Sequence, residues 1–213
     1  MSNNRGKFIT FEGGDGSGKS TQILLAREWL KDAGYDVFST REPGGTKLGE
    51  KIRSILLDPE NPEMADMTEM LLYAASRAQL AREAIEPALA GGKTVICDRW
   101  ADSSMVYQGA ARGLGEAVRT VNKLAAGELF SPDATILLDL DPETALQRAV
   151  GSGSEDRIEA LGAVYQAKVR EAYLKLAKQA PERFFVIDAS GSPEEVHLRV
   201  RTALSGLFAE GAG

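Results

Sequence analysis

The segment from Gly13 to Ser20 reads GGDGSGKS and matches the phosphate-loop pattern G-x-x-x-x-G-K-[ST] at every position. Its glycines let consecutive backbone N–H groups approach anionic oxygens, and the helix expected after it adds the positive end of its dipole. Lys19 can reach terminal phosphates, and the hydroxyl of Ser20 can ligate Mg²⁺. The loop therefore predicts a nucleoside triphosphate site. The residues expected to surround the phosphates are Gly13, Gly14, Asp15, Gly16, Ser17, Gly18, Lys19, Ser20 and Thr21.

A second candidate is the dipeptide Asp98-Arg99, which directly follows an apolar run at 94–97. The carboxylate can hold Mg²⁺ through water, and the guanidinium can bind two phosphate oxygens. An Asp next to an Arg at a strand end is also often a local ion pair. The dipeptide alone therefore leaves both interpretations open.

Two pairs of side chains have the i, i+4 spacing that places residues on one helix face, namely Tyr73 with Arg77 and Ser104 with Gln108. An aromatic ring can stack on a planar base, and a nearby guanidinium or amide can bond to its edge. From spacing alone, packing in the core or exposure on a helix surface is the commoner explanation. The pairs remain candidates for a nucleobase pocket.

None of the motifs contains a histidine that could act as a general base. A nucleoside monophosphate is mostly a dianion at neutral pH, so as an acceptor it needs no base. We expect catalysis by positioning and charge neutralisation, from Lys19, Mg²⁺ and arginines. The one histidine, His197, is expected at the surface, and Cys97 is expected to be a buried small apolar residue.

Length and composition limit the remaining possibilities. The 213 residues predict a single domain over 1–213, with frayed tails at 1–6 and 209–213. Lys and Arg number 25 against 31 Asp and Glu, a net charge of −6, so the total charge gives no indication of nucleic acid or an anionic membrane as partner. The single cysteine suits a reducing compartment, and no apolar run approaches ~20 residues. A cytoplasmic protein is expected.

Apolar runs alternate with amphipathic helical patterns along the chain. Strands are expected at 7–12, 36–39, 94–97, 135–140 and 184–187, with helices in the gaps, for example at 68–90 and 194–208. This alternation predicts an α/β fold, a doubly wound parallel sheet of about five strands with helices on both faces. Ligands bind beyond the carboxyl ends of such strands. Gly13, Arg41 and Asp98 should therefore meet in one crevice.

Several segments together resemble bacterial thymidylate kinases, and the likeness runs in order from about Phe8 to beyond Arg157. They are the phosphate loop with its flanks at 11–21, the segment TREPGGT at 40–46, YAASR at 73–77, Asp98-Arg99, Ser103-Ser104 and the YQG segment at 107–109. The resemblance implies a P-loop kinase core, usually homodimeric. It implies transfer of the γ-phosphoryl group of ATP to dTMP, giving dTDP, in dTTP synthesis.

The resemblance also implies roles for individual residues. Tyr73 resembles the aromatic residue that stacks on thymine, Arg77 the donor to the base, and Tyr107 the residue that crowds the 2′ side of the sugar. Asp15 resembles a loop carboxylate near the 3′-hydroxyl and the metal. The expected metal ligands are Ser20 and Asp98. The full substrate-binding set is Glu42, Arg53, Tyr73, Arg77, Asp98, Arg99, Ser104, Tyr107 and Gln108.

The cation that stabilises the transferred group is less apparent. Some family members carry an arginine in the phosphate loop where this chain has Gly16, and others place several arginines in a lid. Here the expected short mobile lid, 148–159, is rich in Gly and Ser and has arginine only at Arg148 and Arg157. We expect Arg148, or failing that Arg157, to close over the phosphates. The expected catalytic set is Asp15, Lys19, Arg99, Arg148 and Arg157.

Three other functions fit parts of the sequence less well. A kinase of the same fold could act on a different monophosphate. A GTP-dependent switch would need N-K-x-D, but the segment at 122–125 reads NKLA, and the D-x-x-G match at 188–191 follows the last expected strand. A nucleotide-binding regulatory module without turnover gains no support from an intact Lys19 and Ser20.

Overall fold

A computed structural model of the chain describes residues 5–149 and 162–208. Its centre is a five-stranded sheet in the order β2-β3-β1-β4-β5, and the strand pairs are parallel. The predicted doubly wound parallel sheet is confirmed, with small shifts at strand ends. The strands are β1 (Phe8–Glu12), β2 (Val37–Arg41), β3 (Thr94–Asp98), β4 (Ala134–Asp139) and β5 (Phe184–Asp188).

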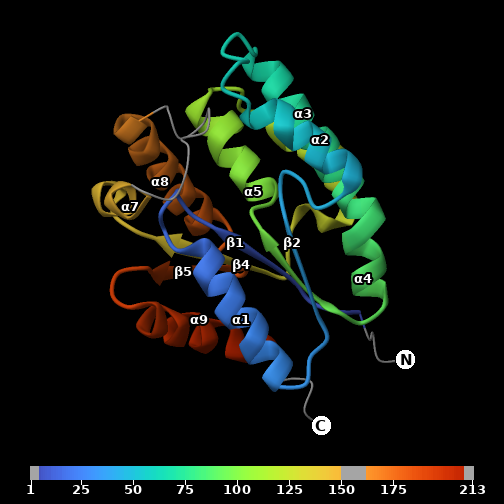
Figure 1. The fold of residues 1–213 in the computed structure, drawn as a ribbon, viewed down its shortest axis with the longest axis vertical. Coiled ribbons are helices and arrows are strands. Elements are labelled where there is room, and N and C mark those ends of the chain that lie inside the picture. The colour runs from blue at the N-terminus through green and yellow to red at the C-terminus, as the bar shows by residue number, and fades with distance from the viewer. Residues whose placement is uncertain (1–4, 150–161, 209–213) are drawn as a thin grey trace.

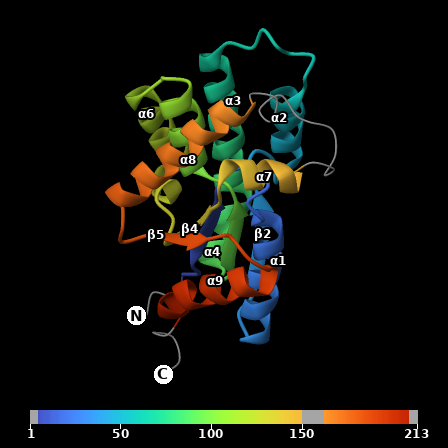
Figure 2. The same cartoon turned by 90° about the vertical axis from the view of Figure 1, so that its left-hand side faces the viewer.

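Helices connect successive strands and cover both faces of the sheet (Figures 1 and 2). They are α1 (Lys19–Asp32), α2 (Lys47–Leu57), α3 (Asp66–Leu80), η1 (Ala81–Ile85), α4 (Glu86–Ala90), α5 (Ala101–Ser104), η2 (Met105–Ala111), α6 (Glu116–Ala126), η3 (Gly127–Phe130), α7 (Pro142–Ala149), α8 (Gly162–Gln179) and α9 (Pro193–Phe208).

The apolar side chains form a core on each side of the sheet. On one face, Leu30 of α1 and Val200 of α9 pack against Ile136 of β4. On the other face, η1, α4 and η3 pack around Trp100, whose ring meets Phe8 edge to face at 5.4 Å between centroids. α8 adds a third cluster, in which Val169 packs with residues of β4, β5 and η2. These cores make the sheet a rigid base for the loops at its carboxyl edge.

The helix expected at 68–90 is interrupted. α3 ends at Leu80, a π-helical turn covers Ala81–Ile85, and α4 then continues to Ala90. Pro87 lies in the first turn of α4 and has no N–H for a bond to the preceding turn. The change of hydrogen-bond register just before this proline lets the chain continue without that bond.

Strand register brings the predicted motifs to one edge. Phe11 of β1 and Arg41 of β2 both pair with Asp98 of β3, and Glu12 pairs with Leu137 of β4. Because the strands are parallel, the loops that follow them leave on the same side. The predicted convergence of the phosphate loop, Arg41 and Asp98 is confirmed.

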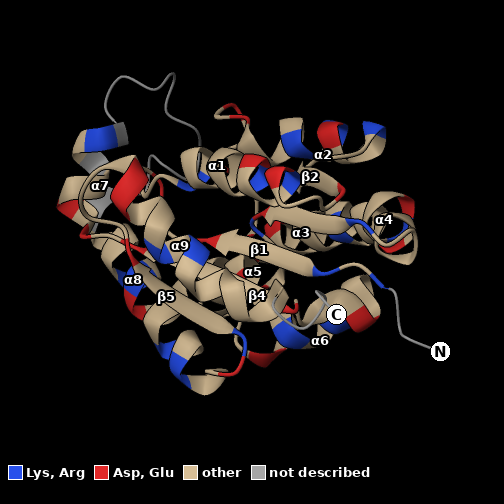
Figure 3. Ribbon diagram, turned by 90° about the horizontal axis from the view of Figure 1, so that it is seen from below, with Lys and Arg blue, Asp and Glu red and all other residues tan. Residues whose placement is uncertain are grey.

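Charged residues of both signs stand next to each other on α2 and around α4 (Figure 3). Among the described residues, no helix is long and apolar enough to cross a membrane.

A buried ion pair joins α5 to the segment before β5. Arg183 donates from Nη1 to Asp102 Oδ2 at 2.6 Å and from Nη2 to Oδ1 at 2.8 Å. Thr135 of β4 also donates to Asp102, at 3.1 Å, and Asp102 is 2% exposed. Losing one partner of such a pair leaves a buried charge uncompensated.

We predict that Asp102→Ala lowers the free energy of unfolding by about 3 kcal/mol, because Arg183 then loses its buried partner. Urea unfolding followed by circular dichroism measures this. The matched control is Asp36→Ala, which breaks an exposed pair with Lys93 and should cost about 0.5 kcal/mol or less. Equal losses in the two variants would contradict the prediction.

Candidate active site

A cavity of about 690 Å³ lies at the carboxyl edge of the sheet. The phosphate loop and α1 line one part of it, and residues of α2, α3, α5 and η2 line another. Apart from Gly13 and Gly14, every residue predicted for the site that the structure describes lines this cavity. These lining residues are Asp15, Gly16, Ser17, Gly18, Lys19, Ser20, Thr21, Glu42, Arg53, Tyr73, Arg77, Asp98, Arg99, Ser104, Tyr107, Gln108 and Arg148.

Three glycines of the phosphate loop, Gly13, Gly16 and Gly18, have positive φ angles that disfavour other residues. Gly18 precedes α1 with φ 90°, and Gly16 has φ 77°. A Cβ at Gly16 would lie 2.0 Å from the backbone oxygen of Ala145 in α7. The described conformation therefore excludes a side chain at this position, which gives a steric reason for the missing loop arginine.

Lys19 lies along the inner wall of the loop and is only 8% exposed. Its Nζ donates to the backbone oxygens of Gly13 at 3.1 Å and Gly14 at 2.8 Å. Burial, together with the nearby Arg99 charge, lowers the pKa of Lys19. The ammonium thus lies where the loop encloses an anion.

Arg99 connects the loop to the far part of the cavity. Its Nη2 lies 2.5 Å from Asp15 Oδ1, and its guanidinium carbon lies 5.2 Å from the ring centre of Tyr107. Burial opposes ionisation of Asp15, but Arg99 and Lys19 hold the pKa of that carboxyl below its usual value. Arg99 has φ 67°, a strained conformation for a residue with a side chain, and its N–H donates to the backbone oxygen of Phe11 at 2.9 Å.

Oxygen donors near the loop fit a hard divalent cation. Oδ1 of Asp98 and Oγ of Ser17 are buried without a hydrogen-bond partner among the described residues. Ser20 is exposed and lines the same cavity. Mg²⁺ prefers such oxygens and keeps several waters, so it needs few protein ligands. The described residues contain no cluster of three or more His, Cys, Asp or Glu with metal-site geometry.

Arg77 is the most extensively bonded side chain of the acceptor part and is 1% exposed. Its Nε donates to Glu42 at 2.9 Å, its Nη2 donates to Glu42 and to Ser104 Oγ, and its Nη1 donates to Asn122. Both oxygens of Glu42 therefore bind Arg77. The asparagine of the NKLA segment is thus a structural partner of Arg77, whereas a switch protein would use it to read guanine.

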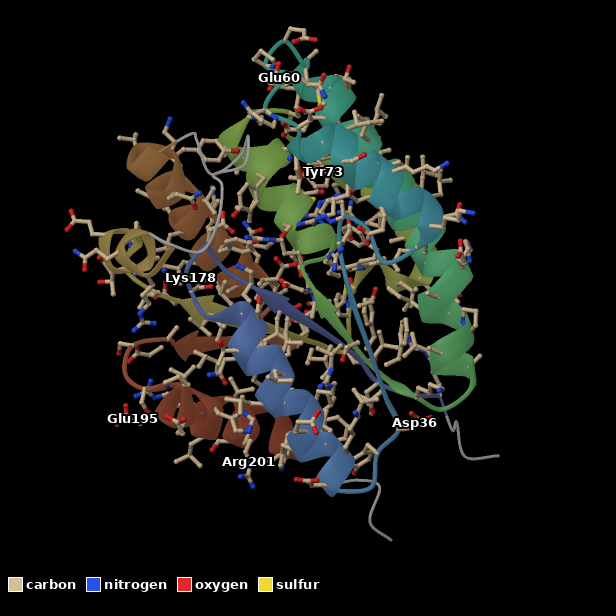
Figure 4. The ribbon with its side chains drawn as sticks, viewed as in Figure 1. Asp36, Glu60, Tyr73, Lys178, Glu195 and Arg201 are labelled. Atoms are coloured by element: carbon tan, nitrogen blue, oxygen red, sulfur yellow. The ribbon has the colours of Figure 1, made fainter. Side chains whose placement is uncertain are left out.

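The other acceptor residues surround this pair. Arg53 donates to the backbone oxygen of Pro43 at 3.0 Å. Tyr73 of α3 is half-buried, lines the cavity and lies among the helices above the sheet (Figure 4). The hydroxyl of Tyr107 is buried and has no partner among the described residues.

Gln108 depends on two residues that the sequence analysis missed. Its Nε2 donates to Glu69 Oε1 at 2.8 Å, and Arg112 donates to Glu69 Oε2 at 3.1 Å. Glu69 has no exposed surface. Glu69 stands among polar and apolar residues of α3, so the helical pattern gave no signal of its burial.

Glu12 directly precedes the phosphate loop, and the sequence analysis assigned it no role. It accepts from Trp100 N at 2.8 Å, Ser103 Oγ at 2.6 Å and Tyr173 Oη at 2.7 Å. Burial raises its pKa to about 7, and the nearby Asp102 adds to the shift. Glu12 thereby joins the end of β1 to the segment that carries Arg99.

The described part of the expected lid is the end of α7. Arg148 is exposed, lines the cavity and donates to the backbone oxygen of Ala189 at 3.2 Å. Arg157 and the remainder of the lid after Ala149 lie outside the described residues, as do residues 1–4 and 209–213 of the expected tails. Gly6, assigned to a tail, donates its N–H to the backbone oxygen of Leu89 at 2.9 Å.

Two residues assigned no role in the site lie outside the cavity lining. Cys97 is fully buried in β3, as predicted. His197 lies on α9 and is half-buried rather than fully exposed, because it neighbours Val196 and Val200 on the buried side of that helix. Burial lowers its pKa.

Comparisons with known proteins agree with this arrangement. The family model of thymidylate kinase matches residues 11–200. Thymidylate kinase from Caldanaerobacter subterraneus subsp. tengcongensis is 54% identical over 201 residues, covering 94% of this chain and 95% of the relative. The Deinococcus radiodurans protein of the same name is 46% identical over 202 residues, covering 94% and 97%.

A solved structure gives the same result for the fold. The crystal structure of thymidylate kinase from Ehrlichia chaffeensis superposes with a TM-score of 0.77 at 32% identity, covering 94% of this chain and 99% of that one. The chain belongs to the thymidylate kinase family.

Proposed function

We propose that the protein transfers the γ-phosphoryl group of ATP to dTMP in this cavity, giving dTDP and ADP. The observation that carries the proposal is that one cavity holds a complete phosphate loop together with Tyr73, Arg77 and Gln108. Two nucleotides bound in it would direct their phosphates toward Arg99 and Lys19. Family membership supports this substrate pair over another monophosphate.

The loop binds the donor. Its backbone N–H groups and the N-terminus of α1 surround the phosphates, and Lys19 moves from the carbonyls of Gly13 and Gly14 to phosphate oxygens. Ser20 and Asp98 would hold Mg²⁺, consistent with the unpartnered Oδ1 of Asp98. Bound Mg²⁺ neutralises phosphate charge. Arg99 and Asp15, already paired, position the acceptor phosphate and the sugar between the two nucleotides.

The acceptor pocket is ordered by the protein's own bonds. Glu42, Ser104 and Asn122 hold the guanidinium of Arg77 in one position. The second N–H of Nη1 is not used by these bonds, and Arg77 needs no further ordering to donate it to the base. Tyr73 stacks on the thymine ring, and Tyr107 crowds the 2′ side of the sugar. The acceptor is a dianion with a second pKa of about 6, so no general base is needed.

Three further assignments belong to the proposal. The chain forms a single catalytic domain with a lid at 148–159, in which Arg148 or Arg157 supplies the transition-state cation. It acts in the cytoplasm as a homodimer. The helices α2 and α3 lie side by side (Figure 1). Exposed apolar side chains on both, Leu48 and Ile55 of α2 and Met67 and Leu71 of α3, support an interface there.

An acceptor panel of dTMP, dUMP, UMP, CMP, AMP and GMP with ATP and Mg²⁺ tests the reaction. We expect the highest kcat/KM with dTMP. Lys19→Met should lower kcat by about 10²–10³-fold because the transferred charge loses its cation. Lys31→Met, an exposed lysine at the end of α1, is the control and should retain wild-type kinetics. Absence of dTMP turnover by the wild-type chain would refute the proposal.

Steady-state kinetics of Arg148→Ala and Arg157→Ala test the lid arginines. At least one variant should lose about 100-fold in kcat, because a cation near the transferred group is removed. Arg119→Ala on α6, outside the cavity lining, is the matched control. Wild-type kcat in both lid variants would leave Arg99 as the cation.

Sedimentation velocity tests the dimer. The wild-type chain should sediment as a dimer, and Leu71→Glu should shift it toward monomer because a charge enters an apolar contact. Leu198→Glu places the same charge on α9, across the sheet, and should leave the dimer intact. A monomeric wild-type chain at working concentration would exclude this assembly.

A further inference from the structure

The side-chain amide of Gln108 is held from behind by a buried carboxylate. Nε2 of Gln108 donates to Oε1 of Glu69 at 2.8 Å, across from η2 to α3. Glu69 has no exposed surface and Gln108 is 2% exposed, yet Gln108 lines the cavity. This contact decides which end of the amide faces the cavity.

Both carboxylate oxygens of Glu69 act as hydrogen-bond acceptors, and Oε1 is the one that faces Gln108. Nη2 of Arg112 donates to the other oxygen, Oε2, at 3.1 Å. Gln108 must therefore direct its NH₂ group toward Glu69. Its carbonyl oxygen is the group left to face a ligand in the cavity.

We infer that Glu69 is a positioning residue that fixes the Gln108 amide so that the pocket accepts a ring N–H and rejects a ring nitrogen lone pair. The inference rests on the proposed function, in which the base lies against Arg77 and Gln108. Thymine offers an N3–H donor beside its O4 acceptor, which suits a carbonyl oxygen beside a guanidinium. In cytosine, the N3 lone pair would face the carbonyl oxygen of Gln108, and the amine would face the guanidinium of Arg77. Two acceptors would then meet at one position and two donors at the other.

The test is Glu69→Gln, which keeps the shape of the side chain and adds a donor. If the oxygen of the introduced amide keeps accepting from Arg112, its NH₂ group faces Gln108 and can donate only to the carbonyl end, so the Gln108 amide reverses. We compare dTMP with dCMP in two measurements. One is the ratio of their kcat/KM values, and the other is the ratio of their dissociation constants, measured by calorimetry. We expect the preference for dTMP to fall at least about tenfold in each. Thermal melting checks that the variant is folded.

Two variants sharpen the test. Glu116→Gln makes the same charge change on α6, at a side chain that is 84% exposed, and should leave the ratio unchanged. The double exchange Glu69→Gln with Gln108→Glu restores the order of groups, because the amide introduced on α3 donates to the carboxylate introduced on η2, whose second oxygen faces the base. This double variant should prefer dTMP over dCMP more strongly than Glu69→Gln alone.

A purely structural role for Glu69 would lower turnover of both nucleotides equally. An unchanged dTMP-to-dCMP ratio in folded Glu69→Gln would overturn the inference. So would dCMP binding that is too weak to measure in both Glu69→Gln and the wild type. In either case wild-type turnover of dTMP would leave the proposed function standing. A wild-type chain that does not phosphorylate dTMP would overturn both.

Discussion

The buried pair between Arg77 and Glu42 is the interaction on which the arrangement of the acceptor pocket depends. Glu42 belongs to the loop after β2, Arg77 to α3, Ser104 to α5 and Asn122 to α6, so four segments distant in sequence meet at one guanidinium. Two buried charges are tolerated because their hydrogen-bonding groups are nearly all used. The same bonds that stabilise the helical layer therefore also orient the group proposed to bind the base.

Buried carboxylates also join other segments that are distant in sequence. Glu12 joins β1 to the segment after β3, Asp102 joins α5 to Arg183, and Glu69 joins α3 to η2. Each carboxylate accepts from at least two donors. Such shared acceptors fix the relative position of loops that the apolar core alone would leave adjustable.

The sequence was sufficient for the sheet, because apolar runs of strand length alternate with amphipathic helices, and parallel connections then determine where loops converge. It was also sufficient for the donor loop, whose residues are contiguous. The π-helical turn before Pro87 was not predicted, since periodicity records the apolar face and not the hydrogen-bond register. Glu12 and Glu69 received no role, because their partners are remote in sequence and only folding brings them together. Arg77 had been assigned to the base, and its bonds to Glu42 and Asn122 show that it also organises the protein.

The contact between the phosphate loop and α7 has an implication for how such enzymes vary. The position of a Cβ at Gly16 is already taken by the backbone oxygen of Ala145, so close packing of α7 and a loop arginine are sterically exclusive in this conformation. A chain that gained the arginine would have to displace α7. The residue at position 16 therefore limits which part of the chain can supply the cation for the transferred phosphoryl group. Substitution of Gly16 by arginine alone would alter the packing of α7.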